Sequence, residues 1–410
     1  MYRILEIEVT QPLPQITLTD RETGVALLIR NRDRGVGFIM YSSKPNSTLD
    51  PEELASIIAR EVGANILKDN LRAELTPLTE DKPAFPSLTV AICTKDRTDN
   101  LTRCLNSLLK LRSEDLDILV IDNAPSDSQT KDLVSGLTGV RYVNEPKPGL
   151  DFARNRAIIE ARGELLAFID DDVVVDRHWL DGLREAWSEN PDAAAFTGLV
   201  LPYELETKAQ IIFEASGGFR RGFDKIRYGK VLPGNPLYPC GAGMFGAGCN
   251  MAFKRKILLK IGGFDEALDT GATLPGGGDL DIFYRVIRAG YPLVYEPQYL
   301  VFHQHRQDLA KLRRQYWSWG LGFMAFVVKT YQTDLVQRPQ LRRLIWWWFK
   351  YQYRQAVQSL SGKNPMPISM VLAELWGGIM GLLGGYQRSV RRIESIAAKF
   401  TPDLNIPVKP

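Results

Sequence analysis

The 410-residue chain carries 51 Lys and Arg residues against 48 Asp and Glu residues, so its net charge of +3 neither favours nor excludes nucleic-acid binding. Four cysteines form no C-x-x-C pair and three histidines form no H-E-x-x-H motif, which argues against zinc sites, a disulfide scaffold and zinc hydrolases. No apolar signal-peptide stretch opens the chain, and a cytoplasmic location is expected.

Residues 1–75 predict a small α+β unit. Strand-like segments alternate with turns up to Tyr41, and Asp50-Pro51 then opens a helix as N-cap and first helical residue. We see no catalytic constellation in this unit. Residues 76–87 contain three prolines and predict a linker.

From Leu88 to Arg306 the pattern predicts an α/β domain with a largely parallel sheet, because short apolar strands alternate with amphipathic helices. Ligands of such sheets bind at the carboxyl ends of the strands. Three predicted strand ends carry polar side chains that should therefore converge on one rim: Thr94 with Asp96, Asp122 with Asn123, and Asp170, Asp171 and Asp172.

The run Asp170–Asp172 is the most unusual of these strand ends. Adjacent carboxylates repel one another unless positive charge lies close, and hard cations such as Mn²⁺ or Mg²⁺ prefer oxygen ligands. The alternative is a solvated turn that caps the next helix. Convergence with two other strand ends favours the metal site, whereas Asp176 is expected to act only as a helix cap.

The sequence lacks a G-x-G-x-x-G after the first strand of this domain and lacks a Walker A motif, which disfavours dinucleotide oxidoreductases and P-loop enzymes. Any phosphate charge would instead meet the cation and basic side chains such as Arg97 or Arg154. Residues 203–239 show no clear periodicity.

A glycine-rich loop, residues 271–278, delivers Asp279 to the head of a predicted helix. A carboxylate there is either a cap or a general base held near a reaction centre. His303 and His305 are spaced i, i+2, so they share one face of a strand and could approach a metal or diphosphate; such a pair is more often structural.

Seven segments resemble family 2 glycosyltransferases, in the order typical of that family. They span roughly residues 86–330 and read VAICTKDRTDNLTRCLNSLL, VIDNAPSD, GLDFARNRAI, AFIDDDVVVDRHWL, GAGCNMAFKR, GGFDEAL and GGGDLDIFYRVIRAGY. The resemblance implies a GT-A fold and an inverting transfer of a sugar, here a hexose, from a nucleotide-diphosphate donor, most often UDP. It also implies a divalent cation, Mn²⁺ or Mg²⁺.

The resemblance assigns roles to residues by motif. Asp279 matches the catalytic base. Asp170 and Asp172 match the D-x-D pair, with Asp172 the firmer metal ligand, Asp171 pointing away and His303 a further metal candidate. The donor-binding set is Thr94, Asp96, Arg97, Asp122, Asn123, Arg154, Asp170 and Asp171, and the acceptor and loop set is Asn250, Gly277, Gly278 and Asp281.

Many family members carry a glutamate where this chain has Gly278. This departure keeps a non-catalytic nucleotide-sugar binding protein open as an alternative. A nucleotidyltransferase, which shares the general fold, is the other alternative, although it should have glycines directly after its first strand. The expected acceptor is a sugar or lipid-linked glycan in polysaccharide, glycolipid or other cell-envelope synthesis.

Residues 307–410 predict a helical, aromatic and basic region. From Arg306 to Lys399 there are fifteen Lys or Arg residues and four acids. The segment 368–386 approaches bilayer-spanning length, but Glu374 and five glycines make an interfacial or core-packed helix the better interpretation. Trp and Tyr beside Lys and Arg suit peripheral contact with an anionic membrane at its cytoplasmic face; the alternative is a helical subdomain. A nucleic-acid partner is not expected.

Overall fold

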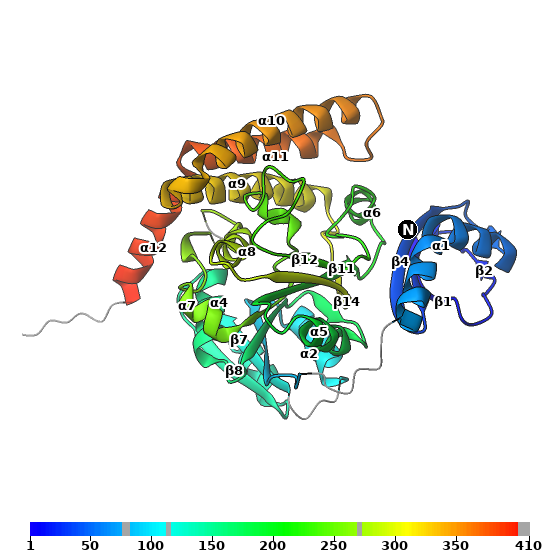
Figure 1. Ribbon diagram of the computed structural model, residues 1–410, viewed down its shortest axis with the longest axis horizontal. Coiled ribbons are helices and arrows are strands. Elements are labelled where there is room, and N and C mark those ends of the chain that lie inside the picture. The colour runs from blue at the N-terminus through cyan, green and yellow to red at the C-terminus, as the bar shows by residue number, and fades with distance from the viewer. Residues whose placement is uncertain (76–82, 112–115, 269–272, 401–410) are drawn as a thin grey trace, which may run out of the picture.

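The computed structural model describes residues 1–75, 83–111, 116–268 and 273–400. They form a small N-terminal unit, a central sheet covered by helices on both faces, and a layer of long helices packed along one side (Figure 1). Most of the predicted linker, residues 76–82, and the last ten residues of the predicted helical region lie outside the described residues.

The N-terminal unit is a three-stranded sheet covered by one helix. Its strands lie in the order β1-β3-β4, with β1 parallel and β4 antiparallel to β3. The helix buries Leu54, Ile57, Ile58 and Val62 against the sheet. The elements are β1 (Tyr2–Glu8), β2 (Ile16–Thr17), β3 (Gly24–Asn31), β4 (Arg34–Ser42), β5 (Thr48–Leu49) and α1 (Pro51–Leu75).

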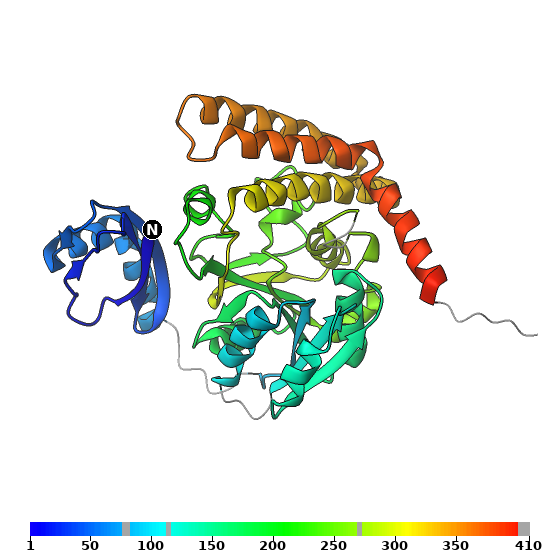
Figure 2. The ribbon, with the colours of Figure 1, turned by 180° about the vertical axis from the view of Figure 1, so that it is seen from behind.

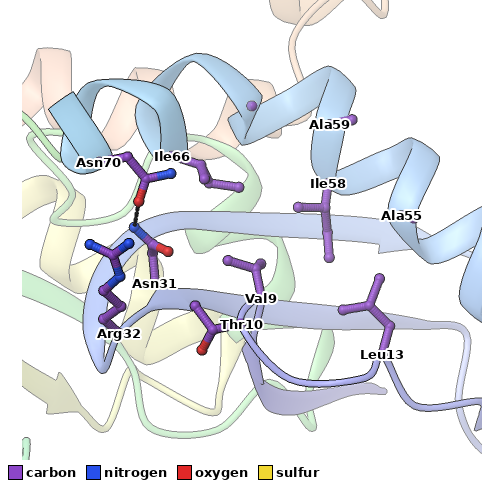
Figure 3. A pocket seen from close by; sticks show the side chains of 11 residues that line it. Val9, Thr10, Leu13, Asn31, Arg32, Ala55, Ile58, Ala59, Ile66 and Asn70 are labelled. Atoms are coloured by element: carbon purple, nitrogen blue, oxygen red, sulfur yellow. Dashed lines mark hydrogen bonds between the residues drawn. The ribbon is translucent and has the colours of Figure 1, made fainter.

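An open pocket of about 410 Å³ lies between α1 and the edge of this sheet (Figure 3). Apolar side chains, among them Val9, Leu13 and Ile58, line most of it, while Asn31 and Arg32 lie at one end. The Asn31 amide donates hydrogen bonds to Asp69 and Asn70 of α1, which ties the end of β3 to the helix.

The central sheet follows the order β10-β14-β11-β13-β9-β6-β7-β8, and β12 pairs with β14. Among the described residues, six of its nine strands point the same way, whereas β10, β12 and β13 run against them. The strands are β6 (Leu88–Thr94), β7 (Leu116–Asn123), β8 (Val140–Glu145), β9 (Leu165–Asp170), β10 (Val173–Val175), β11 (Ala195–Pro202), β12 (Ile226–Tyr228), β13 (Asn250–Lys254) and β14 (Leu293–His303). The predicted α/β architecture with a mostly parallel sheet is confirmed.

Two hydrophobic clusters, one on each face, attach helices to this sheet. Side chains of α2, α3 and α5 contribute to one cluster, and those of α4, α7 and α8 to the other. The helices are α2 (Thr98–Leu109), α3 (Gln129–Ser135), α4 (Leu150–Glu160), α5 (Trp179–Glu189), α6 (Lys208–Ala215), α7 (Arg255–Lys260) and α8 (Gly278–Arg288). The stretch 203–239, which has no periodicity in the sequence, thus contains α6 and β12.

Strand register brings the predicted strand ends together. Thr94 of β6 pairs with Asp122 of β7, and Cys93 pairs with Asp170 of β9 on the other side. All three strands are parallel, so their carboxyl ends form one rim, as the sequence predicts.

The C-terminal helices stack outward from the sheet, α9 first and α10 with α11 outside it (Figures 1 and 2). Close packing of α11 on α9 depends on glycine: a Cβ at Gly377 would overlap the Trp317 carbonyl, and one at Gly320 would overlap that of Glu374. The helices are α9 (Leu309–Thr333), α10 (Arg338–Leu360), α11 (Ile368–Met380) and α12 (Tyr386–Phe400).

Within the described residues, one segment, Ile368–Phe400, is long and apolar enough to cross a membrane by length and composition. The backbone kinks inside it, at Leu383 and Gly384, and α11 buries Met370, Val371, Gly377 and Gly378. One face of α11 therefore belongs to the protein core.

The N-terminal unit contacts the central domain through charged and polar groups and through Leu28 and Phe38, which join one hydrophobic cluster of the central sheet. Arg30 of β3 forms a buried ion pair with Asp176, and the Gln298 side chain exchanges two 2.9 Å hydrogen bonds with the Gly35 backbone. Asp176 also accepts a hydrogen bond from the His178 backbone N–H (3.0 Å) at the start of α5. The expectation that Asp176 acts only as a cap is wrong, because the same carboxylate holds the two units together.

We predict that Glu374→Gln stabilises the protein at pH 8 but not at pH 5. Burial raises the pKa of Glu374 to about 7 from 4.5, so ionisation opposes folding as the pH rises from 4.5 through 7. The expected gain at pH 8 is about 2 kcal/mol. Denaturant unfolding at pH 5 and pH 8 measures the change in unfolding free energy, and Glu61→Gln at an exposed position is the control. An equal change at the two pH values would contradict the prediction.

Candidate active site

The aspartate run splits into one half-exposed and two buried carboxylates. Asp170 ends β9 and its side chain is 36% exposed, whereas those of Asp171 and Asp172 are almost fully buried. The expectation that Asp171 points away is wrong. Its Oδ2 accepts a 2.7 Å hydrogen bond from the Thr94 hydroxyl, and its Oδ1 lies 2.6 Å from Arg97 Nη1.

Arg97, just before α2, is the counter-charge for the two buried carboxylates. Its Nη2 donates a 2.8 Å hydrogen bond to Asp172 Oδ2 while Nη1 contacts Asp171. Arg306 adds a second cation 3.7 Å from Asp172 Oδ2. Burial alone would raise the pKa of Asp172, but His303, when it is protonated and no metal is bound, and Arg97 lower this pKa well below its usual range, so the carboxylate is ionised.

The other oxygen of Asp172 faces a candidate metal position. Asp172 Oδ1 is buried and has no hydrogen-bond partner among the described residues, although His303 Nε2 lies 3.3 Å away. Ligand atoms of Asp170, Asp172 and His303 all lie within 4.8 Å of one another. Two carboxylates and an imidazole suit Mn²⁺, and a divalent cation would satisfy the orphaned oxygen. The residues fit the predicted cation.

Hydrogen bonds behind His303 select the tautomer that a metal requires. His303 Nδ1 lies 3.1 Å from His305 Nδ1, and His305 Nε2 lies 3.0 Å from Glu214 Oε2. Glu214 also lies 2.6 Å from the Arg220 guanidinium, and a carboxylate accepts hydrogen bonds. His305 therefore donates from Nε2 to Glu214 and accepts at Nδ1 from His303, which leaves His303 Nε2 free to bind a cation.

The part of the rim beside β7, where the nucleoside is predicted to bind, is polar, and only some of its hydrogen-bonding groups have partners in the protein. Asp122 accepts a 2.9 Å hydrogen bond from the Tyr142 hydroxyl, while its buried Oδ1 has no partner within the described residues. Burial raises the pKa of Asp122. Asp96 accepts from the backbone and hydroxyl of Ser126, both at 2.8 Å, and Asn123 binds the backbone of Lys147 and Gly149. Asp96 and Asn123 thus hold the loops around Asp122.

Asp279 and the aspartate run lie on either side of Arg154. The buried Arg154 guanidinium contacts Asp151 at 3.1 Å and Asp170 at 4.0 Å. A Cβ at Gly248 would lie 3.1 Å from both Arg154 Nη2 and Asp279 Cβ, and the Gly248 N–H donates to Asp279 Oδ2 at 3.2 Å. Asp279 is half-buried, and its Oδ1 accepts a 2.9 Å hydrogen bond from the Leu280 N–H, so the carboxylate binds the first turn of α8 and also lies near Arg154.

The glycines before Asp279 are explained by close contacts. Gly277 has φ +104° and approaches the Gly322 backbone of α9, while a Cβ at Gly278 would overlap the Asp151 carboxylate. Asp151 therefore fills the space that a side chain at position 278 would need, and the departure from the family pattern is a packing requirement of this chain.

Two of the predicted acceptor residues are engaged in the core. The buried Asn250 amide accepts from Trp179 Nε1 (3.1 Å) and donates to the Tyr299 carbonyl (2.7 Å). Asp281, also buried, pairs with Arg285 at 2.7 Å and with Lys329 of α9. Asn250 thus connects β13 with α5 and β14, and Asp281 connects α8 with α9.

Sequence reasoning missed Asp151, Glu214 and Arg220. Asp151 lies within the segment GLDFARNRAI, three residues before Arg154, so a search for a partner of that arginine could have found it. Glu214 and Arg220 lie in the stretch without periodicity, and no sequence signal connects them with His305.

We predict that His305→Phe weakens Mn²⁺ binding about 10- to 100-fold, because His303 loses the acceptor that fixes its tautomer. Phenylalanine keeps the ring packing against Phe213, whose ring centroid lies 4.7 Å away. Glu214→Gln should weaken binding less, since an amide oxygen can still accept. Calorimetric titration with MnCl₂ checks both variants; the matched control is His178→Phe on the surface, and unchanged affinity in His305→Phe would refute the tautomer assignment.

We also predict that Gly278→Ala destabilises the fold by about 1–3 kcal/mol, because its Cβ overlaps Asp151. Gly278→Glu, which restores the family glutamate, should be no better. The double variant Gly278→Ala with Asp151→Ala removes the overlap. Urea unfolding should therefore show a loss of unfolding free energy in the double variant that is smaller than the sum of the losses in the two single variants. Strict additivity would show that the two positions do not compete for space.

Comparison with known proteins gives a match to one family model and to several glycosyltransferases. Residues 89–262 match the model described as glycosyl transferase family 2. A pre-mycofactocin glycosyltransferase of Mycobacterium tuberculosis is 27% identical over 61% of this chain and 49% of its own length. The glucosyl-dolichyl phosphate glucuronosyltransferase of Haloferax volcanii is 24% identical over 43% of this chain and 56% of its own length. The chain thus spans about half the length of these relatives.

A solved structure also resembles the chain: the mannosyltransferase PcManGT from Pyrobaculum calidifontis, in complex with GDP-Man and Mn²⁺. The two share 17% identity over 84% of this chain and 91% of that chain, with a TM-score of 0.46. The part of the chain that matches glycosyl transferase family 2, residues 89–262, lies within the predicted α/β domain and is less than half of the chain.

Proposed function

We propose that the chain is an inverting glycosyltransferase that moves a hexose from a nucleotide-diphosphate sugar to an acceptor hydroxyl. The observation that carries the proposal is the group Asp170, Asp172 and His303, in which one buried carboxylate oxygen of Asp172 has no hydrogen-bond partner among the described residues. The match of residues 89–262 to glycosyl transferase family 2 supports the same reaction class.

In this proposal, Asp172 and His303 hold Mn²⁺ or Mg²⁺, with Asp170 on the donor side. When bound, the cation stabilises the charge that develops on the departing nucleoside diphosphate. Arg154 lies next to Asp170 and adds fixed positive charge near the same leaving group. Arg97 stays with Asp171 and Asp172 and keeps the carboxylates in place.

The nucleoside is proposed to bind beside Asp122. The unsatisfied Oδ1 of this residue is buried and would accept a hydrogen bond from an imide N–H of the base. Uracil provides such a donor, and UDP is therefore the proposed carrier; guanine and thymine also offer ring N–H groups, so GDP- and dTDP-sugars are the competitors in a binding screen.

Asp279 is proposed to take the proton from the acceptor hydroxyl. The Gly248 N–H fixes one carboxylate oxygen, and the glycines at 276–278 let the loop approach α9 closely. A single displacement opposite the leaving group inverts the anomeric centre and requires no enzyme nucleophile.

The acceptor is proposed to be a sugar or lipid-linked intermediate of cell-envelope polysaccharide or glycolipid synthesis. The Haloferax volcanii relative is named for a glucosyl-dolichyl phosphate, which is a sugar on a lipid phosphate. Such an acceptor is presented at a membrane surface, and the proposed location is the cytoplasm, at the cytoplasmic face of the membrane. We propose no nucleic-acid partner.

The two remaining alternatives make different predictions about turnover. A non-catalytic binding protein would bind donor and Mn²⁺ but would not hydrolyse a nucleotide-sugar without acceptor. A nucleotidyltransferase would release pyrophosphate from a nucleoside triphosphate. Thermal-shift assays with Mn²⁺ and UDP-, GDP- or dTDP-sugars, followed by assays for free nucleoside diphosphate, separate the three functions.

We predict that Asp279→Asn lowers sugar transfer by about 10²- to 10⁴-fold and leaves donor affinity unchanged. The amide is nearly isosteric and can still accept from one of the two backbone N–H groups that bind the carboxylate, those of Gly248 and Leu280, so the base is lost while the side chain stays in place. Donor hydrolysis and calorimetric binding of UDP with Mn²⁺ measure the two effects. The control is Asp181→Asn, whose side chain is 65% exposed on α5; near-normal turnover of Asp279→Asn would rule out this base.

A further inference from the structure

The outer face of α10 carries large apolar side chains that are exposed to solvent. Leu341, Leu344, Trp348 and Gln352 face the core and are buried. On the opposite side of the helix, Trp346 is 68%, Tyr353 70% and Leu360 75% exposed. Exposed groups of this size usually mark an interaction surface.

The outer face of α11 continues this surface. Trp376 is 57% and Leu372 52% exposed, and Leu383 follows at the kink. The glycine contacts fix this orientation: Gly377 and Gly378 press against α9 and Trp348, so residues on the other side of α11 point outward. Both views show α10 and α11 as the layer farthest from the sheet (Figures 1 and 2).

The charge of this layer is almost entirely positive. The stretch from Arg338 to Met380, which contains α10 and α11, has six Lys or Arg residues and one acid, Glu374. Arg342, Arg343, Lys350 and Arg354 are exposed on α10, and Lys350 lies over the Trp346 ring at 5.3 Å. Glu374 instead lies on the inner side of α11, where its carbonyl meets Gly320 of α9.

We propose that the outer face of α10 and α11 docks on the surface of an anionic lipid bilayer. Trp and Tyr rings suit the headgroup region, the apolar side chains enter the acyl boundary, and the Arg and Lys side chains contact lipid phosphates. The charges select this occupant: a second copy would place this basic face against itself, whereas an anionic membrane complements it.

The geometry favours lying on the membrane over spanning it. The 13 residues of α11 extend about 20 Å, less than the roughly 30 Å hydrocarbon core, and the chain kinks immediately afterwards. The inner face of α11 packs against α9. The segment Ile368–Phe400 therefore supplies an interfacial helix followed by α12, which packs back toward residues 264–268.

Docking in this way would place the candidate base near the lipid. Gly322 of α9 contacts the loop at Gly277, and Gly320, two residues earlier and on the opposite side of the helix, contacts α11. With helix layers 8–10 Å apart, Asp279 lies about 20 Å from the membrane surface. This consequence rests on the proposed transfer to a lipid-linked acceptor; the docking itself does not.

Flotation of the full chain with vesicles tests the proposal. Wild type should float with phosphatidylcholine vesicles that contain about one-third phosphatidylserine and remain mostly soluble with phosphatidylcholine alone. Trp346→Glu with Trp376→Glu should abolish flotation. Arg343→Gln with Arg354→Gln should weaken the partition about 25-fold, roughly fivefold per charge, and added salt should act likewise.

The matched control is Ile159→Glu with Leu259→Glu, two exposed apolar residues on α4 and α7. It adds the same charge, and flotation should be unchanged. The Trp346/Trp376 variant should keep wild-type thermal unfolding and Mn²⁺-dependent donor hydrolysis, so a membrane defect is distinguishable from a failure of the proposed chemistry. Flotation of that variant at wild-type level, absence of wild-type binding at low salt, or a dimer that the variant dissociates would each overturn the proposal.

Discussion

The candidate site depends on neutralising three adjacent carboxylates at the end of one strand. Burying Asp171 and Asp172 without partners would cost several kcal/mol each, and Arg97 removes most of that cost by contacting both. Its guanidinium takes one oxygen of each carboxylate, which leaves Asp172 Oδ1 turned toward His303. The contacts with Arg97 that stabilise the buried carboxylates therefore also orient Asp172 Oδ1 toward the candidate metal position.

The site is consequently built in two layers. Asp170, Asp172 and His303 offer the ligand atoms, while Arg97, His305 and Glu214 determine how those atoms point. The second layer extends to the N-terminal unit, since Arg220 pairs with Glu214 and lies over the Phe38 ring of β4 at 5.3 Å. The buried pair of Arg30 and Asp176 fixes the unit that carries Phe38, so its position and the geometry around His303 are structurally connected.

Much of the fold could be predicted because its determinants are local. Apolar runs that end in Thr94, Asp122 and Asp170 identify parallel strands, and parallel strands align their carboxyl ends. The aspartate run and the family resemblance then identified the rim. Asp171 was misjudged because its partner, Arg97, lies some 75 residues away, and alternation along a strand says nothing about such a contact. The role of Asp176 was misjudged and that of Glu214 was missed for the same reason, since their partners Arg30 and His305 are distant in the sequence.

The central claim is that Asp172, His303 and Asp170 hold one divalent cation at the donor rim. Anomalous diffraction from a crystal grown with MnCl₂ and UDP tests it most directly. We predict a single manganese peak that contacts Asp172 Oδ1 and His303 Nε2, with the diphosphate on the side of Asp170. Ordered UDP without manganese at these atoms, or a manganese peak elsewhere on the rim, would contradict the account.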